Sequence, residues 1–394
     1  MHTSTIQRLE ELAETRADAL DRLIRSDALA HSADRAADHG ATGDVLILED
    51  HNFAQTYWAL ADALGEEPAP RVLVRQRSYA QARDLHALIS NEAPDAIHLL
   101  KIAGLTAEGQ RDHATLAVSG FLRTHGFAGA LALGRLPKSH GALHDWAHDL
   151  TLSAPEATLI LGGNTKHMNR TFNDTLERSF TQVRGLRGKG KHRCLLASGA
   201  RTAVEVGTGE DRCEADTPGH LRGFGGVFSG AKADRGGHLL ATAAVDYLRH
   251  ADHGQRVLDL GCGNGSVTRQ VLDEAPAGVV RRVVATDVDA DAVRSAAANL
   301  SDPRVTVTWD AAAADLPDSS VDLVLLNPPF HEGTRIDLTL VRPLLDAARR
   351  VLAPGGTLLL VHNSHARYRT QVQERFEHVD QVTRDSTFTV LRAR

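Results

Sequence analysis

The chain has 394 residues, of which 42% are hydrophobic and 24% are charged, and its formal net charge is −6. This length predicts two domains, each large enough to bury its own core. No apolar run approaches the roughly 18 residues of a transmembrane helix, and the charged first residues lack the apolar core of a signal peptide. We therefore expect a cytoplasmic protein that makes no membrane contact.

The cysteines and the net charge exclude further classes. Cys194, Cys213 and Cys262 are too few and too scattered for a disulfide framework or a zinc site, so we expect no metal. The negative charge excludes a basic surface over the whole protein. Any contact with nucleic acid must therefore come from a local patch.

The first half begins with apolar side chains at helical spacing, which predict a surface helix over Ile6–Leu29. Short apolar runs follow, with helix-like stretches between several of them. This alternation indicates an α/β domain with a largely parallel sheet. The predicted strands are Val45–Leu48, Val72–Val74, Ala96–Leu100, Ala128–Leu133 and Thr158–Leu161.

The segment from about Gly199 to Gly226 is polar and rich in Gly, Thr, Asp and Glu, although Thr202–Val206 has the pattern of a strand. Such a change in composition is typical of a domain junction. We therefore predict one domain over residues 1–205 and a second over residues 206–394.

The second half repeats the alternation of strands and helices. Pro354–Gly356 predicts a turn between a helix and a strand. The predicted strands are Arg256–Leu260, Arg282–Thr286, Val305–Trp309, Leu323–Leu326, Thr357–His362 and Phe388–Leu391. The predicted helices are Ser266–Glu274, Ala290–Leu300 and Leu338–Leu352.

The two halves resemble each other in pattern. Asp44–Asp50 aligns with Arg256–Cys262, and Arg71–Arg83 aligns with Arg282–Arg294. Ala130–Ser139 occupies the place that Asp322–His331 has in the second half. These echoes indicate a tandem duplication in which one copy kept the chemistry.

A glycine-rich loop follows the first strand of the second half, where Val257–Gly265 reads VLDLGCGNG. Glycines permit a tight turn and let a ligand approach the backbone. A dinucleotide loop presents N–H groups to a pyrophosphate, next to which the carboxylate of Asp259 would be unfavourable. S-adenosylmethionine has no phosphate but carries an ammonium and a sulfonium, so the acid favours this cofactor.

Two more acids end the following strands. A carboxylate at Asp287 can accept both hydroxyls of a ribose, and Asp310 can accept from the adenine amine. Cys262 is interpreted as a small loop residue, because no base accompanies its thiol.

An Asn-Pro-Pro-Phe motif at Asn327–Phe330 ends the fourth strand of this half, at the edge where ligands bind in open α/β sheets. Pro328 and Pro329 fix the backbone and remove two N–H groups. The side-chain oxygen of Asn327 and the carbonyl of Pro328 can then both accept from one exocyclic amine.

This arrangement suits methylation of a nucleobase amine, whose lone pair is delocalised into the ring. Two acceptors favour a more localised lone pair and orient the nitrogen toward the methyl group, so positioning supplies part of the catalysis. Phe330 can stack on the base. His331 either contacts the substrate or hydrogen-bonds the turn.

The segments VLDLGCGNG, TDVD and NPPFHEG together resemble the bacterial ribosomal RNA guanine-N2 methyltransferases of the small methyltransferase domain group. The resemblance extends to Gly226–Gly237, where it implies that Phe228, Ser229 and Asp234 lie by the methionine part of the cofactor, with Arg235 in place of the family's usual apolar residue. The cofactor positions predicted in full are Phe228, Ser229, Asp234, Asp259, Gly261, Cys262, Gly263, Asn264, Gly265, Asp287, Val288, Asp310, Ala311 and Asn327.

The first half is similar to the degenerate first domain of this family, through Leu136–Ser139 and Gly162–Asn173. The resemblance therefore implies two tandem Rossmann-like class I methyltransferase domains, of which the N-terminal one is degenerate. Asn363–Tyr368 and the final FTVLRAR are closer to the large-subunit (23S) enzymes than to their small-subunit (16S) relatives.

The N-terminal half is not expected to bind cofactor, because Val45–Asp50 runs into His51–Phe53 without a glycine turn. It does contain the densest basic run of the chain, which either grips RNA phosphates or forms a solvated face. These residues are Arg184, Arg187, Lys189, Lys191 and Arg193.

The sequence thus predicts methylation of the N2 amine of a guanosine in 23S ribosomal RNA, either naked or in a subunit precursor, by a monomer. Three alternatives stay open. They are a 16S guanine-N2 methyltransferase, a protein-glutamine or DNA-adenine N-methyltransferase, and a catalytically silent RNA-binding protein of ribosome assembly.

Overall fold

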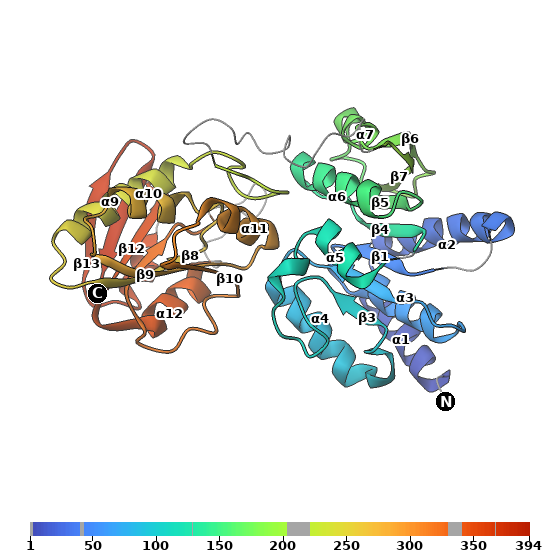
Figure 1. Ribbon diagram of the computed structural model, residues 1–394, viewed down its shortest axis with the longest axis horizontal. Coiled ribbons are helices and arrows are strands. Elements are labelled where there is room, and N and C mark those ends of the chain that lie inside the picture. The colour runs from blue at the N-terminus through green and yellow to red at the C-terminus, as the bar shows by residue number, and fades with distance from the viewer. Residues whose placement is uncertain (1–2, 40–42, 128, 203–220, 330–340, 367) are drawn as a thin grey trace. The chain divides into compact units, whose positions relative to one another are not determined.

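The structure is a computed structural model, and it describes residues 3–39, 43–127, 129–202, 221–329, 341–366 and 368–394. The chain divides into two compact units, Met1–Asp211 and Arg212–Arg394 (Figure 1). The division falls at residues that are not described, and so does most of the strand predicted at Thr202–Val206. None of the described helices has the length and hydropathy needed to cross a membrane.

The N-terminal unit is built on a seven-stranded sheet of order β3-β2-β1-β4-β5-β7-β6. Neighbours from β3 to β5 pair in parallel, while β7 pairs antiparallel with both β5 and β6. Its strands are β1 Val45–Leu48, β2 Val72–Arg75, β3 Leu100–Ile102, β4 Leu131–Arg135, β5 Thr158–Asn164, β6 Phe180–Gly185 and β7 His192–Ala200. Its helices are α1 Thr3–Arg16, α2 Ala19–His39, α3 Ala54–Leu64, α4 Tyr79–Glu92, α5 Val118–His125, α6 His140–Ser153 and α7 Arg170–Glu177, with short 3₁₀ turns at Pro94–Ala96 and His113–Thr115.

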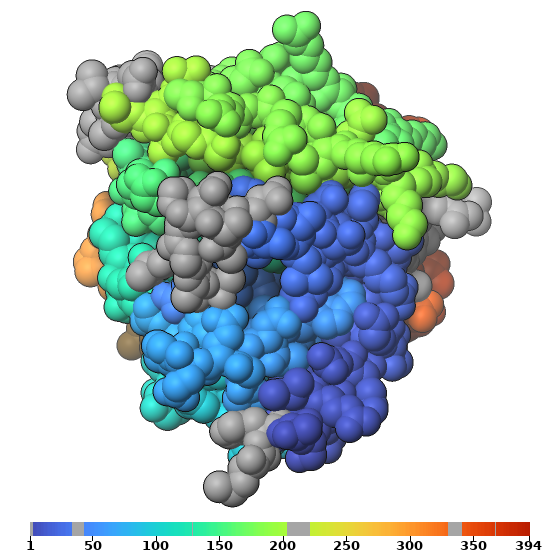
Figure 2. All heavy atoms as spheres, turned by 90° about the vertical axis from the view of Figure 1, so that its right-hand side faces the viewer, coloured from blue at the N-terminus to red at the C-terminus, as the bar shows by residue number. Residues whose placement is uncertain are grey.

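The single surface helix predicted over Ile6–Leu29 is wrong, because two helices with buried apolar faces occupy this segment. The break is a capping box. Asp18 Oδ1 accepts from the N–H groups of Leu20 and Asp21, and Asp21 Oδ2 accepts from the N–H of Asp18. α2 then packs against β5 and β7, and in Figure 2 dark blue residues near the N-terminus lie next to yellow-green ones.

Two other expectations for this unit need correction. The strand predicted at Ala96–Leu100 begins at Leu100, because Pro94–Ala96 forms a 3₁₀ turn. The hairpin of β6 and β7 was not predicted, because exposed polar side chains of β6 interrupt the apolar pattern. β1, by contrast, has the predicted bounds, Val45–Leu48.

The C-terminal unit has a sheet of order β10-β9-β8-β11-β12-β14-β13, which repeats the order of the first sheet strand for strand. This identity of topology confirms that the chain has two tandem domains of the same fold. The strands are β8 Gln255–Leu260, β9 Val280–Asp287, β10 Val305–Trp309, β11 Val321–Leu326, β12 Leu352–Asn363, β13 Val379–Arg384 and β14 Phe388–Ala393. The helices are α9 Arg235–Arg249, α10 Ser266–Glu274, α11 Ala290–Asn299, α12 Val341–Val351 and α13 Tyr368–Gln373.

Strand β11 shows how this sheet is covered on both faces. Leu323 and Leu325 pack with apolar residues of α9 and α10, whereas Val324 and Leu326 pack with those of α12. In Figure 1, α9 and α10 accordingly lie on one side of the sheet and α12 on the other. Burial on both faces explains why β11 reads as a continuous apolar run.

The turn predicted at Pro354–Gly356 is wrong, since this segment lies inside β12. The pairing of β11 with β12 shifts between Val321 and Leu323, and Gly355 has φ 79°. The glycines therefore form an irregularity within a strand. The edge strand β13 was not predicted either, because most of its side chains are exposed and polar.

Candidate active site

The glycine loop connects β8 to α10 as predicted. Gly261, Gly263 and Gly265 all have positive φ, at 81°, 55° and 82°, a conformation that costs other residues free energy. The N–H groups of Gly261 and Cys262 donate to the carbonyl of Thr286. The turn is thereby tied to the end of the neighbouring strand β9.

A cavity of about 350 Å³ lies over this loop at the carboxyl edge of the parallel strands, within the usual size range of small-molecule sites. The structure brings most of the predicted site residues to its wall. They are Phe228, Ser229, Asp234, Gly261, Cys262, Gly263, Asn264, Asp287, Val288, Asp310, Asn327, Pro328 and Pro329.

Three predicted cofactor positions do not line this cavity, namely Asp259, Gly265 and Ala311. Asp259 is 2% exposed, and its carboxylate accepts from the hydroxyl of Thr268 at 2.6 Å. Burial raises the pKa of Asp259 to about 6. Its observed contact therefore fixes the start of α10 to β8, behind the wall of the cavity.

Asp287 lies at the cavity wall, at the end of β9. Its carboxylate accepts from the N–H groups of Gly263 and Asp289, at 2.9 and 3.0 Å. Burial, reinforced by the negative charge of Asp289, raises the pKa of Asp287 to about 7. Asp310, which is 3% exposed, accepts from the N–H of Asp315.

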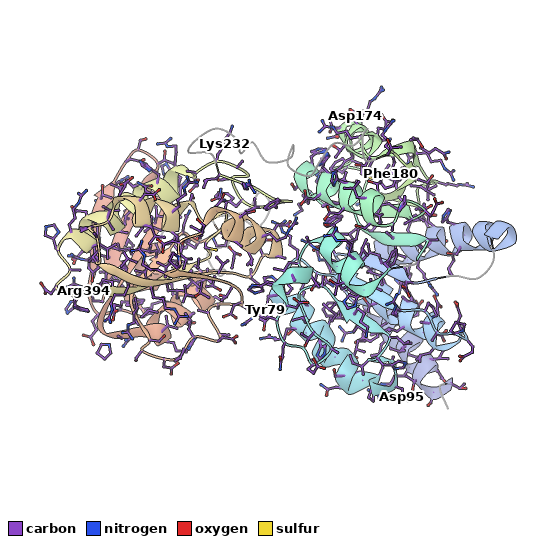
Figure 3. The ribbon with its side chains drawn as sticks, viewed as in Figure 1. Tyr79, Asp95, Asp174, Phe180, Lys232 and Arg394 are labelled. Carbon is purple, nitrogen blue, oxygen red and sulfur yellow. The ribbon has the colours of Figure 1, made fainter. Side chains whose placement is uncertain are left out.

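The loop of Phe228 and Ser229 forms another wall. Asn264 holds it, because its side-chain amide donates to the carbonyls of Gly230 and Lys232 at 3.0 and 2.8 Å. Figure 3 shows Lys232 in the segment that leads into α9. The side chain of Phe228 is 63% exposed beside the cavity, as expected of an apolar surface that a ligand covers.

Cys262 is 5% exposed, and burial raises the pKa of its thiol well above the ordinary value. A thiol of this kind stays protonated and is a poor nucleophile. The structure thus gives no support to a catalytic cysteine.

The Asn-Pro-Pro turn follows β11 directly. The Asn327 side chain donates from Nδ2 to Oδ2 of Asp234 at 3.2 Å. Its Oδ1 is buried and has no hydrogen-bond partner among the described residues. Phe330, which is predicted to stack on the base, lies outside the described residues. So does His331, which is predicted either to contact the substrate or to hydrogen-bond the turn.

Sequence reasoning missed several residues of the wall. Asp289 had a signal, because it caps α11 by accepting from the N–H of Asp291. The other missed residues of the cavity wall are mainly apolar, or they lie in strands and helices next to the sequence motifs rather than in the motifs themselves. They are Leu260, Ser266, Val267, Thr286, Ala292, Ala312 and Leu344.

Residues 220–392 match the model of the methyltransferase small domain family. Over 360 residues, the chain is 31% identical to ribosomal RNA large subunit methyltransferase G of Pseudomonas aeruginosa (strain UCBPP-PA14), covering 89% of this chain and 87% of that relative. The protein of the same name from Ectopseudomonas mendocina (strain ymp) is 32% identical over 61% of this chain, and the match spans 64% of the relative's length.

The chain belongs to the family of these ribosomal RNA large subunit methyltransferase G proteins. The solved structure of a T. thermophilus 16S rRNA N2 methyltransferase, in complex with AdoMet and guanosine, has the same fold at 20% sequence identity. The TM-score is 0.60, and the match covers 90% of this chain and 88% of that structure.

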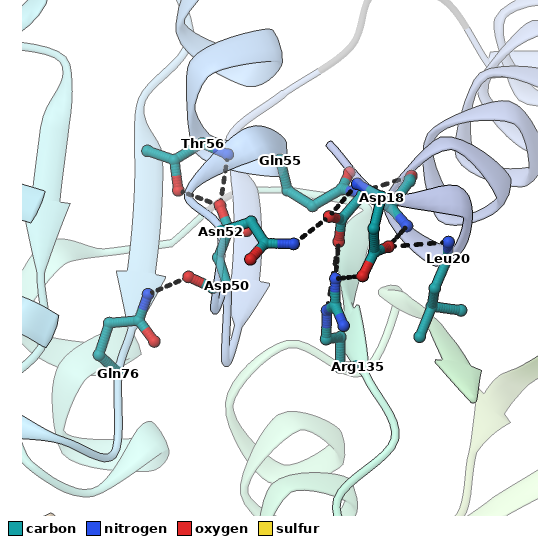
Figure 4. A network of polar contacts seen from close by, with 9 residues as sticks. Asp18, Leu20, Asp50, Asn52, Gln55, Thr56, Gln76 and Arg135 are labelled. Carbon is teal, nitrogen blue, oxygen red and sulfur yellow. Dashed lines mark hydrogen bonds and ion pairs between the residues drawn. The ribbon is translucent and has the colours of Figure 1, made fainter. Parts of the chain in front are cut away.

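This family member carries a different arrangement at the corresponding edge of its N-terminal sheet (Figure 4). Arg135, which ends β4, is paired with Asp18 and Asp21 at 2.8 and 2.6 Å. Asn52, which follows β1, donates to Asp21 at 2.8 Å. The side chains of Arg135 and Asn52 at this edge are therefore held by polar contacts with the first turn of α2.

The predicted basic run lies on the hairpin of β6 and β7. All five side chains are exposed, and none has a carboxylate partner in the described part of the chain. The N–H of Thr165 donates to the carbonyl of Lys191 at 2.8 Å, so the loop after β5 adjoins the hairpin. This loop adds the exposed side chains of Lys166 and Arg170, the latter at 3.7 Å from Asp174.

Proposed function

We propose that this protein transfers a methyl group from S-adenosylmethionine to the exocyclic N2 amine of a guanosine in 23S ribosomal RNA. The observation that carries the proposal is Oδ1 of Asn327, which lies beside the glycine-loop cavity and has no hydrogen-bond partner among the residues that the structure describes. A buried acceptor without a partner costs free energy. A site that retains one is built to receive a donor, and an exocyclic amine is such a donor.

The cavity wall fits the cofactor in charge and shape. The carboxylate of Asp287 would accept hydrogen bonds from the ribose hydroxyls, and that of Asp310 would accept a hydrogen bond from the adenine amine. Phe228 and Val288, 63% and 40% exposed, would be covered by its apolar surface. When bound, the cofactor supplies a methyl group on a sulfonium.

The remaining chemistry belongs to the protein. Oδ1 of Asn327 and the carbonyl of Pro328 accept from the two hydrogens of the amine and orient its lone pair. Because Pro329 has no N–H, the turn offers acceptors without a competing donor at that position. Positioning of this kind lowers the barrier without a strong general base.

The names of the relatives favour large-subunit RNA over 16S RNA, protein and DNA. The test is an assay with labelled cofactor on naked 23S RNA, naked 16S RNA, both assembled subunits and bulk protein. We expect label in 23S RNA as N2-methylguanosine. Label confined to 16S RNA or to protein would contradict the proposed substrate, and no label in any of them would contradict the proposed activity.

We also propose that the basic side chains on the hairpin of β6 and β7 bind RNA phosphates. Reversing Arg184, Lys191 and Arg193 to Glu should weaken RNA binding and reduce the dependence of log K on log salt by about 0.7 for each phosphate that is no longer neutralised. Reversals of Arg8 and Arg83 to Glu, matched against a hairpin variant that reverses Arg184 and Arg193 alone, should change the slope little, because Arg8 and Arg83 are exposed on α1 and α4. An unchanged slope in the hairpin variant would exclude this surface.

Finally, we propose that the chain acts as a monomer, since the described residues that line the cavity all belong to the C-terminal unit. Activity should then be proportional to enzyme concentration, and light scattering should give the mass of one chain. Activity that appears only with a dimer would contradict this.

A further inference from the structure

Asn327 and Asp234 form one polar pair at the cavity. Oδ2 of Asp234 accepts from Nδ2 of Asn327 at 3.2 Å and from the N–H of Gly237 at 2.9 Å. A carboxylate offers only acceptors. The amide of Asn327 must therefore turn its NH₂ toward Asp234, which directs Oδ1 to the opposite side.

The orientation of this amide is not fixed by shape, because the oxygen and nitrogen of an Asn amide are nearly equal in size. With the amide reversed, two oxygens would meet and the NH₂ would occupy the place of the acceptor. An amine of the substrate would then face a donor and could not hydrogen-bond to it. The acceptor oxygen of Asp234 thus selects the orientation that the proposed chemistry requires.

Two glycines allow Asp234 to reach this place. A Cβ at Gly236 would lie 3.0 Å from Oδ2 of Asp234 and 3.2 Å from the ring of Phe388. A Cβ at Gly237 would lie 3.1 Å from Val267 and 3.7 Å from Nδ2 of Asn327. The first turn of α9 approaches the end of β11 closely because both positions lack a side chain.

We propose that Asp234 is a positioning residue for methyl transfer, which sets the amide of Asn327 so that its Oδ1 receives the substrate amine. This inference rests on the proposed function and adds to it a role other than contact with the cofactor. The same carboxylate oxygen also caps α9, so the two roles must be separated by experiment.

Two substitutions separate them. Ser caps a helix about as well as Asp, but its shorter side chain does not reach Asn327. D234S should therefore keep the thermal stability, the cofactor Kd and the KM for RNA while kcat falls about 100-fold, the size of effect that a small misplacement produces. In D234N the amide oxygen can accept both hydrogen bonds, so kcat should stay within about fivefold of the wild-type value.

D246S is the matched control, because Asp246 lies exposed near the other end of α9, 4.0 Å from Arg249. It should leave all four quantities unchanged. A wild-type kcat in D234S would overturn the inference. So would a raised cofactor Kd with unchanged kcat at saturation in both D234S and D234N, because the carboxylate would then serve the cofactor.

Asn327→Ala in the same assay distinguishes this inference from the proposed function. If the wild-type protein labels none of the RNA substrates, the proposed function fails, and if N327A turns over like the wild type, the roles of both Asn327 and Asp234 fail while the proposed function stands. If N327A is inactive and D234S is fully active, the role assigned to Asp234 fails while the proposed function stands.

Discussion

Asp287 combines two properties that are seldom found in one carboxylate. It lines the cavity, and it is buried deeply enough that its pKa is raised to about 7. An ionised carboxylate accepts from both hydroxyls of a ribose, whereas a protonated one has less capacity to accept. The affinity for the cofactor should consequently depend on pH near neutrality.

We predict that the Kd for cofactor is constant above about pH 8 and rises as the pH falls through about 7, approaching a tenfold change per pH unit. Asp287 is ionised above its pKa and protonated below it, which sets this direction. Titration calorimetry at several pH values measures the effect. D287N, which cannot titrate, should bind more weakly with a flat profile above pH 6, and a flat wild-type profile would contradict the prediction.

A second prediction at this scale concerns Asn327. Asn327→Ala removes the oxygen that has no partner in the described part of the chain and that is proposed to accept from the substrate amine, so turnover should fall by at least about 100-fold. The Kd for cofactor should change little, since Asp287 and Asp310 remain. Single-turnover kinetics and calorimetry on the same preparation measure both, and full activity would exclude Asn327 from the mechanism.

The sequence predicted the position of a single residue in the site correctly where the chemistry of its side chain suits the cofactor or the substrate. Asp287 and Asn327 are of this kind, and both line the cavity. Asp259 shows the limit, because its position two residues before Gly261 suggests a contact with the cofactor. Whether such a side chain faces a ligand or a helix depends on its rotamer, and here it meets Thr268.

At the scale of elements, the glycine loop contains a position, Gly265, where both the backbone conformation and a steric contact disfavour any residue with a side chain. Gly265 has φ 82°, and a Cβ there would lie 2.9 Å from the side chain of Leu300. Gly278 has φ 78°, but a Cβ there would meet nothing within 4 Å. The two positions share the backbone strain and differ in the steric contact.

We predict that Gly278→Ala destabilises the C-terminal unit by about 1 kcal/mol, from backbone strain alone. Gly265→Ala should cost about 1–3 kcal/mol more, because Leu300 must move in a packed cluster. It should also weaken cofactor binding, whereas Gly278→Ala should not. Urea unfolding of each variant gives the comparison, and equal losses would show that the contact with Leu300 relaxes freely.

Elements were predictable where one pattern extends over the whole element. β8, β11 and α10 follow from continuous apolar runs and from glycines that mark the turn. The missed strands β6 and β13 carry mainly exposed side chains, and each is held by a neighbouring strand. Pairing between strands, rather than local pattern, decides such elements. The break at Asp18 did have a signal, since Asp18 and Asp21 stand at capping-box spacing.

For the whole molecule, the repeated strand order means that the same sheet edge exists twice. In the C-terminal unit this edge carries the cavity. In the N-terminal unit Asp50, which follows β1, accepts from the N–H and the hydroxyl of Thr56, both at 2.8 Å. Gln76 donates to the carbonyl of Asp50 at 2.9 Å. Asp50, Thr56 and Gln76 thus hydrogen-bond to one another at this edge, while Oδ1 of Asp50 and Oε1 of Gln76 are buried without a hydrogen-bond partner among the described residues.

We predict from this that each chain binds one molecule of cofactor. A second site would require Arg135 to leave Asp18 and Asp21, and separating the buried carboxylate of Asp21 from its partner is costly. Calorimetry with S-adenosylhomocysteine, the cofactor without its transferable methyl group, should give a stoichiometry of one. Asp287→Ala should weaken that event by about 1–3 kcal/mol and reveal no second one. A stoichiometry of two, or binding that persists unchanged in this variant, would place a site in the N-terminal unit.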